Sequence, residues 1–406
     1  MTSEQSRHTV GDYVTLQRGT TYKGSLVGEP GPALLGLGSI ETGGGFRHGH
    51  YKTYGGDCPS KLMLFPGELY VALKGATKDG EMIGSVARVP SNVSSGRLTQ
   101  DTVKLVFRDA YPDNVNYLYW VLRTPQYRSY CRNHATGSAV VALSRSDFLD
   151  FPVPPLTSRR TALVNMLSVL EAKIEANSRL VRPLRKLAVA MLQQAVDPAA
   201  RFVVNQVADV RKGLSYTGAG LADEGMAMVN LANAENFGWF KRSGLKYYTG
   251  AYKPRHVAPP GSLLVSGVDL TWRLAIIGWP MLLPEDLGPA LFSHHIFLVD
   301  FRPEWDWLRL PLWAHLYATN VRAHLEGMAY GTTVATLPAE ALTDLEFPAT
   351  PKDSPALSVA YDLIRRAWVA ERETEALSAL RDTLLPSLLS GELRVRDAES
   401  LVRDAI

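Results

Sequence analysis

Apolar residues recur at alternating steps of four and three over residues 156–196. This spacing places them along one side of a helix for about four heptads, which is typical of a coiled-coil seam. Pro154-Pro155 precedes the pattern and Asp197-Pro198 follows it. We therefore predict a helix of roughly 35 residues, about 50 Å long, with a kink at Pro183. The seam consists of Leu163, Leu167, Leu170, Ile174, Asn177, Val181, Leu184, Ala188 and Met191.

A weaker seam of the same period lies in residues 356–406, where Gly391 is expected to end the helix. Residues 156–196 carry a net charge of +5 and residues 356–406 a net charge of −2. We expect the two helices to pair, and because the chain must fold back between them, the predicted geometry is an antiparallel coiled coil. The alternative is that each helix packs on its own domain. The second seam consists of Leu363, Ala367, Ala370, Thr374, Leu377, Arg381, Leu384 and Leu388.

The segments 1–155 and 197–355 have the short apolar runs and the Gly- and Pro-rich turns of mixed α/β domains. One helix is expected at roughly Asn116–Tyr130 and a matching one near Pro311–Leu325. Strands are expected at Ala33–Leu37, Leu69–Leu73, Val103–Phe107, Met228–Leu231, Leu263–Val265, Leu274–Ile277 and Ile296–Val299.

These two segments match each other at a constant offset of 194 residues. Gly19 matches Gly213, Tyr22 matches Tyr216, and Pro66-Gly67 matches Pro260-Gly261. We interpret the match as a tandem duplication; the alternative is two unrelated halves of similar composition. The predicted fold class is α+β, with duplicated mixed α/β domains and two long helices. The predicted boundaries are 1–155, 156–196, 197–355 and 356–406.

Composition limits the classes of protein that fit. The chain has 406 residues, of which 46% are hydrophobic, and a net charge of +3, which excludes a uniformly basic coat. Any contact with nucleic acid must then rest on local patches. Two cysteines, Cys58 and Cys131, exclude a disulfide-rich scaffold. No apolar run approaches the ~20 residues that span a bilayer, so we expect a cytoplasmic protein without membrane contact.

The usual catalytic signatures are missing. The chain has no Gly-x-x-x-x-Gly-Lys-Ser/Thr phosphate loop and no polar-Pro-Pro-aromatic motif of DNA amino-methyltransferases. Glu171-Ala-Lys173 resembles part of a nuclease site, but it lies in the predicted helix, where we expect a solvent-facing position. His294-His295 lacks further ligands at metal-binding spacing. We therefore predict a non-catalytic chain that binds neither a metal nor a cofactor.

Three groups of residues are candidates for DNA contacts, because they combine cations with aromatic, hydroxyl and flexible glycine positions. Residues 236–268 contain no Asp or Glu, and a matching stretch lies in the first half. The alternatives are a solvated face and ordinary turns. The first group is Lys241, Arg242, Lys246, Tyr247 and Arg255, with Arg47, His48, His50 and Lys52; the second is Lys74, Thr77 and Lys78, with Trp272 and Arg273; the third is Gly137 and Ser138, with Gly331, Thr332 and Thr333.

With these features in this order, the chain resembles the specificity (S) subunit of type I restriction–modification systems. The resemblance covers nearly the whole chain. It rests on the tandem repeat and on four signatures: Arg18-Gly19 and Lys212-Gly213; the Pro-Gly turns before apolar runs; the Gly-Ser/Thr turns followed by Leu143 to Pro154 or Leu337 to Pro348; and Leu388-Leu-Ser-Gly391-Glu-Leu-Arg394 near the end. The segment before Arg18-Gly19 departs from the family pattern.

The resemblance implies two target-recognition domains that each read one half of a split, asymmetric double-stranded DNA target. It implies that the helices set the distance between half-sites and dock two methyltransferase subunits, and through them the restriction subunits. S-adenosylmethionine, ATP and Mg²⁺ would then belong to the partner subunits. Three alternatives stay open: the specificity subunit of a type II system with a fused methyltransferase–nuclease, an uncharacterised DNA-modifying enzyme, and a structural adaptor.

Overall fold

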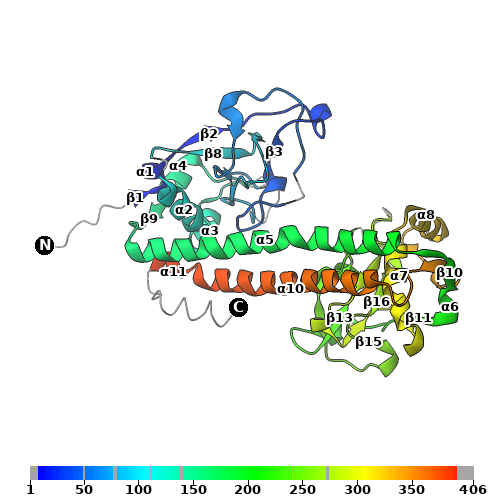
Figure 1. The fold of residues 1–406 in the computed structure, drawn as a ribbon. Coiled ribbons are helices and arrows are strands. Elements are labelled where there is room, and N and C mark those ends of the chain that lie inside the picture. The colour runs from blue at the N-terminus through cyan, green and yellow to red at the C-terminus, as the bar shows by residue number, and fades with distance from the viewer. Residues whose placement is uncertain are drawn as a thin grey trace. The chain divides into compact units, whose positions relative to one another are not determined.

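The computed structural model describes residues 8–48, 51–75, 80–109, 111–137, 141–236, 238–270 and 274–390 (Figure 1). The chain divides into two compact units. Unit 1 comprises Met1–Ala176 and Glu373–Ile406, and unit 2 comprises Asn177–Arg372. Both divisions fall inside long helices, so each unit contains a part of both.

Unit 1 is built on two sheets. The larger sheet has four antiparallel strands in the order β2 (Val14–Arg18), β8 (Thr102–Phe107), β5 (Leu69–Ala72), β6 (Val86–Arg88). The smaller sheet has the order β3 (Ala33–Leu35), β7 (Gly96–Leu98), β4 (Met63–Leu64), with β3 and β7 parallel. A further pair joins β1 (His8–Thr9) to β9 (Pro152–Val153) and so ties the start of the domain to its end.

Unit 2 repeats this plan. Its four-stranded sheet has the order β11 (Ala208–Lys212), β20 (Ile296–Phe301), β16 (Leu263–Ser266), β18 (Pro280–Leu282). Its second sheet has the order β12 (Leu221–Ala222), β14 (Lys246–Tyr248), β13 (Met226–Val229), β19 (Ala290–Phe292), β15 (Val257–Ala258). Two strand pairs complete it: β10 (Asp197–Val203) with β22 (Glu346–Ala349), and β17 (Val268–Asp269) with β21 (Ala335–Thr336).

The 194-residue offset seen in the sequence also relates the elements of the two units. The bounds of β2, β6, β7 and β8, moved by this offset, coincide with those of β11, β18, β19 and β20. Strands are short and alternate with turns in both units, and the expected strands from Ala33, Leu69, Val103, Met228, Leu263 and Ile296 are all present with small shifts at their ends.

The expected strand at Leu274–Ile277 is wrong. Leu274 has a φ of 51° and Gly278 a φ of 65°, values that an extended strand does not contain. The buried Asp269 carboxylate accepts a hydrogen bond from the Ile276 amide at 3.1 Å, and the Arg322 guanidinium donates to the Ile277 and Gly278 carbonyl oxygens, each at 2.6 Å. These tertiary contacts hold the segment as a turn.

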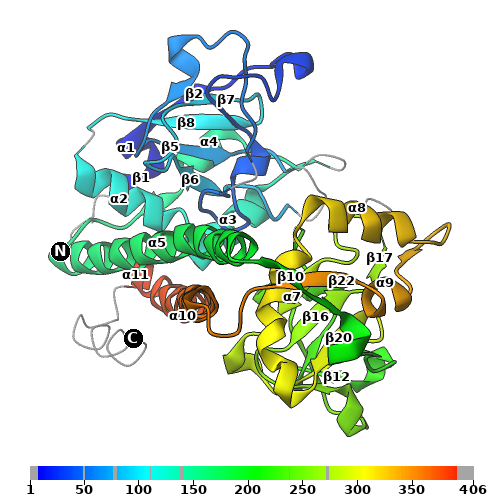
Figure 2. The same cartoon turned by 45° about the vertical axis from the view of Figure 1, so that its right-hand side comes forward.

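The expected single helix at Asn116–Tyr130 is also wrong, because the chain forms α2 (Pro112–Val121) and α3 (Pro125–His134). Pro125 cannot continue a preceding helix, and it starts α3 with the Thr124 hydroxyl accepting from the Tyr127 amide at 3.4 Å. Unit 2 breaks at the matching place, into α7 (Arg309–His315) and α8 (Thr319–Met328). Figure 2 shows α7 beside β22. The remaining helices are α1 (Val10–Tyr13), α4 (Arg145–Leu149), α6 (Val204–Val207) and α9 (Glu340–Thr343), together with short 3-10 turns.

Each of the two segments, 8–155 and 197–354, is followed by a long helix. The first, α5 (Ser158–Gln194), continues through Pro183, and the second, α10 (Pro355–Leu384), is followed by α11 (Ser387–Ser390). Gly391, expected to end this helix, lies outside the described residues. In unit 1 the beginning of α5 packs on the end of α10 and on α11: Leu167 and Leu170 share one cluster with Leu377, Leu384 and Leu388. The Arg160 guanidinium also donates to the Leu388 and Leu389 carbonyl oxygens, at 3.0 and 3.1 Å.

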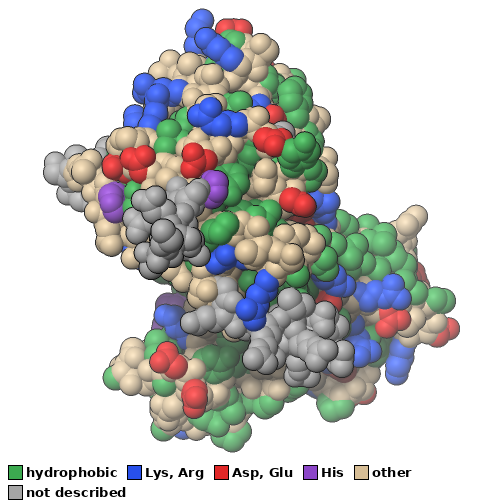
Figure 3. Space-filling model, turned by 90° about the vertical axis from the view of Figure 1, so that its left-hand side faces the viewer, with side chains coloured by type: hydrophobic (Ala, Val, Ile, Leu, Met, Phe, Trp, Pro, Cys, Tyr) green, Lys and Arg blue, Asp and Glu red, His purple; other side chains and the backbone are tan. Residues whose placement is uncertain are grey.

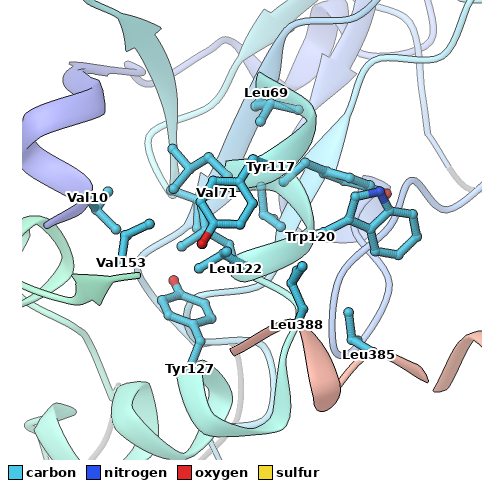
Figure 4. Close-up of a cluster of buried hydrophobic side chains, with 14 of the residues drawn as sticks. Val10, Leu69, Val71, Tyr117, Trp120, Leu122, Tyr127, Val153, Leu385 and Leu388 are labelled. Atoms are coloured by element: carbon cyan, nitrogen blue, oxygen red, sulfur yellow. The ribbon is translucent and has the colours of Figure 1, made fainter. Parts of the chain in front are cut away.

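The core of unit 1 lies between the four-stranded sheet, α2, α3 and the two long helices (Figure 4). Tyr117 and Trp120 of α2 are fully buried there, beside Leu69 and Val71 of β5. Unit 2 has the corresponding core, in which Ala188 and Leu192 of α5 share a cluster with Ile364 and Trp368 of α10. In both units the helix pair is thus part of the domain's hydrophobic core.

Candidate nucleic-acid interface

In unit 2 the candidate residues lie on the second sheet and the turns beside it. Lys246 and Tyr247 of β14 are exposed, whereas Tyr248 is buried against Tyr216, with ring centroids 5.9 Å apart. The buried tyrosine anchors the strand and leaves the lysine and the tyrosine before it in solvent. Lys241 is also exposed, and its amide donates to the Asn233 carbonyl oxygen at 2.8 Å.

Arg255 is exposed in a 3-10 turn, Pro254–His256, that directly precedes β15. The turn is fixed from two sides. The buried His256 ring accepts a hydrogen bond from the Lys253 amide at 3.3 Å, and the Arg211 guanidinium donates to the Arg255 carbonyl oxygen at 3.3 Å. Burial, together with the charges of Arg255 and Lys253, lowers the pKa of His256. The lowered pKa favours the neutral ring, whose Nδ1 accepts the hydrogen bond from the Lys253 amide.

Arg242 has a different environment from the other cations of its stretch. Its side chain is 7% exposed and forms ion pairs with Asp286 at 2.6 Å and with Glu371 of α10 at 3.7 Å. Burial raises the pKa of Asp286, but the hydrogen bonds and charge of Arg242 outweigh it and keep that pKa below its usual value. Arg242 would have to leave both carboxylates to reach a phosphate, so loss of its side chain would disturb unit 2 itself.

In unit 1 the matching residues lie around the smaller sheet. Lys52 and His48 are exposed, Arg47 is half-buried, and the His48 ring contacts Phe46 edge-on at 5.2 Å. The Lys52 carbonyl oxygen accepts from the Leu34 amide at 2.7 Å, which joins this segment to β3. In Figure 3, Lys and Arg side chains gather on the end of unit 1 that lies away from α5.

The second and third groups are described only in part. Lys74 is exposed and forms a β-bridge with Ala142, while Thr77, Lys78, Ser138, Trp272 and Arg273 lie outside the described residues, as does His50 of the first group. Gly137 and Gly331 occupy matching turns with φ values of 120° and 114°, which few other residues adopt. Thr332 and Thr333 are exposed beside Gly331. All three groups remain predictions as DNA contacts.

A buried polar cluster that the sequence did not predict lies where the unit 1 domain meets α5. Arg123, two residues after the end of α2, forms an ion pair with Glu171 of α5, and the Tyr119 hydroxyl donates to the same carboxylate at 3.1 Å. Of the motif Glu171-Ala-Lys173, the Lys173 side chain is 51% exposed, as expected, whereas the Glu171 side chain is only 17% exposed, so the solvent-facing position expected for Glu171 is wrong. The helix period could not reveal this, because the partner Arg123 lies 48 residues earlier in the chain, between α2 and α3.

Among the described residues, no three His, Cys, Asp or Glu side chains come close enough to hold a metal ion. His294 and His295 lie with ring centroids 3.8 Å apart, and burial together with the His294 charge lowers the pKa of His295. Within the same part of the chain, no helix is both long and apolar enough to cross a membrane.

The described chain is an α+β protein with two similar units and two long helices that enter both cores. Its fold is similar to that of the type I restriction–modification system S subunit from M. genitalium, with a TM-score of 0.58 and 13% sequence identity over 96% of this chain and 98% of that one. No protein-family model and no curated protein sequence matches the chain.

Two further solved structures match over almost their whole length at lower TM-scores. One is the HsdS subunit from Thermoanaerobacter tengcongensis, with a TM-score of 0.32 and 16% identity over 97% of this chain and 100% of that one. The other belongs to work on complex assembly and conformational transition of the type I R-M system, with a TM-score of 0.38 and 14% identity over 95% and 97%. Only the first likeness supports an argument about the fold.

Proposed function

We propose that this chain is the DNA-specificity subunit of a type I restriction–modification complex. In this proposal each recognition domain reads one half of a split, asymmetric DNA target. The observation that carries it is the likeness in fold to an S subunit, which spans 96% of this chain. The exposed cations at matching positions in or beside the smaller sheet of unit 1 and the second sheet of unit 2 support it, since phosphate contacts by Lys and Arg position a protein on the duplex.

We further propose that the two units arose by tandem duplication. Support comes from the shared strand order of the larger sheets and from the single offset that relates the bounds of four strand pairs. Because the two units are similar in fold but differ in their surface loops, we expect them to read two half-sites of different sequence. The proposed target is therefore non-palindromic.

The two long helices are proposed to form an antiparallel coiled coil that sets the distance between half-sites. The beginning of α5 packs on the end of α10 in unit 1, and the end of α5 packs on the beginning of α10 in unit 2, which supports this geometry. At 1.5 Å per residue a helix of this length spans about 50 Å, or about fifteen base pairs.

The remaining surface of the helices is proposed to dock two methyltransferase subunits, and through them the restriction subunits. We assign methyl transfer from S-adenosylmethionine, ATP use and Mg²⁺-dependent cleavage to these partners. The chain's own residues then have one task, which is to select the DNA sequence.

Reconstitution tests this assignment. The full chain alone, given S-adenosylmethionine or Mg²⁺, is expected to leave DNA unmodified; together with its methyltransferase subunits it is expected to direct methylation to a defined set of sites. Methylation or cleavage by the chain alone would show an enzyme instead. If the methyltransferase subunits methylated the same sites without the chain, the chain would be an adaptor that takes no part in selecting the DNA sequence.

A further inference from the structure

Two pairs of exposed cations occupy matching places in the two units. Lys52 and Lys246 are related by the 194-residue offset, and so are Lys61 and Arg255. All four side chains are exposed, and among the described residues none of the four forms an ion pair. Arg242, by contrast, is held by two carboxylates. The Arg255 Nε lies 3.2 Å from His256 Nε2. None of the four cations has to leave a carboxylate to meet a ligand.

The backbone around each pair is the same in both units. The Lys52 carbonyl oxygen accepts a hydrogen bond from the Leu34 amide of β3, and Lys246 pairs with Met228 of β13. Leu34 and Met228 are themselves related by the 194-residue offset. Lys61 and Arg255 each occupy the middle of a 3-10 turn, Ser60–Leu62 or Pro254–His256, directly before β4 or β15. Beside them Tyr54 contacts Tyr22 at 6.0 Å, as Tyr248 contacts Tyr216 at 5.9 Å. Each unit thus presents its two cations from equivalent backbone positions.

Neighbouring surface positions differ between the units. Tyr247, which is 37% exposed, stands where unit 1 has the half-buried Thr53, and Tyr252, which is 43% exposed, stands where unit 1 has the half-buried Cys58. Both units thus have the cations at equivalent positions, whereas only unit 2 has the exposed tyrosines at the neighbouring positions of the sequence.

A DNA duplex presents two kinds of chemical group to the two units, phosphates and base edges. The phosphate backbone is the same at both half-sites, and the base edges are not. We infer that Lys52, Lys61, Lys246 and Arg255 bind DNA phosphates at both half-sites, while Tyr247 and Tyr252 contribute to base choice in unit 2. This inference rests on the proposed function and adds to it a division of labour among residues.

The test is the salt dependence of DNA binding by the full chain in complex with its methyltransferase subunits. Anisotropy titrations between 50 and 200 mM NaCl use a duplex with the methylated motif and a scrambled duplex. Each of Lys52→Ala, Lys61→Ala, Lys246→Ala and Arg255→Ala is expected to make the negative slope of log K against log salt shallower by about 0.9 on both duplexes. The ratio of the two affinities is expected to stay unchanged.

Matched variants give the controls. Arg255→Lys, which copies the residue type of Lys61, is expected to keep the slope, and Lys352→Ala, at an exposed position before α10, is expected to leave binding unaltered. Tyr247→Thr, which copies Thr53, is expected to keep the slope and change the affinity ratio.

If the four alanine variants kept the salt slope of the unchanged complex, the inference would be overturned, but the proposed function would stand. If the four alanine variants lost affinity for the motif duplex only, the inference would be overturned too, because this result would indicate contacts with bases and not with phosphates. Absence of any sequence preference in the unchanged complex would overturn the proposed function.

Discussion

Arginine and lysine have two distinct uses in this chain, and burial separates them. Arg128 and Arg322 are 7% and 6% exposed and donate to carbonyl oxygens of the turns that end at Gly84 and Gly278. They are related by the 194-residue offset and shape equivalent turns. Lys52 and Lys246 extend into solvent at equally matched positions. A residue type that is the same at matching positions of the two units therefore indicates a structural role where it is buried and a candidate ligand contact where it is exposed.

Cys131 provides a test of the residue environment in unit 1. Its thiol is fully buried, and desolvation, although opposed by Tyr127 and nearby arginines, raises its pKa to about 11. Because the thiolate is the reactive form, we expect iodoacetamide at pH 8 to label native Cys131 about a hundredfold more slowly than the unfolded chain. Mass spectrometry of the labelled peptides measures both rates.

The Cys58→Ser variant serves as the control in this experiment, because it removes the only other thiol, which is half-buried. Equal labelling rates for Cys131 in the native and the urea-unfolded chain would contradict the described packing of α3.

Elements defined by a local pattern could be predicted from sequence, and those defined by distant contacts could not. The helix α5 and most strands follow from periodicity and apolar runs. The break before Pro125 is a local rule as well, since proline ends a preceding helix. The turn at Leu274–Ile277 depends instead on Arg322, which lies on a different helix.

The same distinction applies to the candidate site. The absence of acidic residues in 236–268 and the repeat offset located Lys246 and Arg255, both of which are exposed. Arg242 looks identical in sequence, yet Asp286 and Glu371 bury its guanidinium. Sequence could not separate these arginines, because exposure is set by residues far along the chain.

The long helices carry the prediction that belongs to the scale of elements. Deleting one heptad from each helix, next to the division between Ala176 and Asn177 in α5 and between Arg372 and Glu373 in α10, keeps both seams in register. It removes about 10 Å of helix, or about three base pairs. We expect a spacer-library selection to return a shorter gap between unchanged half-sites.

Deleting a heptad from only one helix serves as the control, because it mismatches the seam and is expected to destabilise the chain. Selection of the parental spacing by the doubly shortened chain would contradict the proposal that the helices set the distance.

For the whole molecule, the near-neutral net charge results from cancellation between segments of opposite charge. The net charge of +3 is the sum of +3 for residues 1–155, +5 for residues 156–196, −3 for residues 197–355 and −2 for residues 356–406. A protein of this kind can contact DNA through small patches without the charge of a general DNA-coating protein.

The most direct test of the central claim is methylome sequencing of two host strains, one with this chain and one without it. If the chain selects the DNA sequence, the strain that has it shows a split, asymmetric motif with methylated adenines, and this motif is unmethylated in the strain that lacks it. An identical set of methylated motifs in both strains would contradict the account.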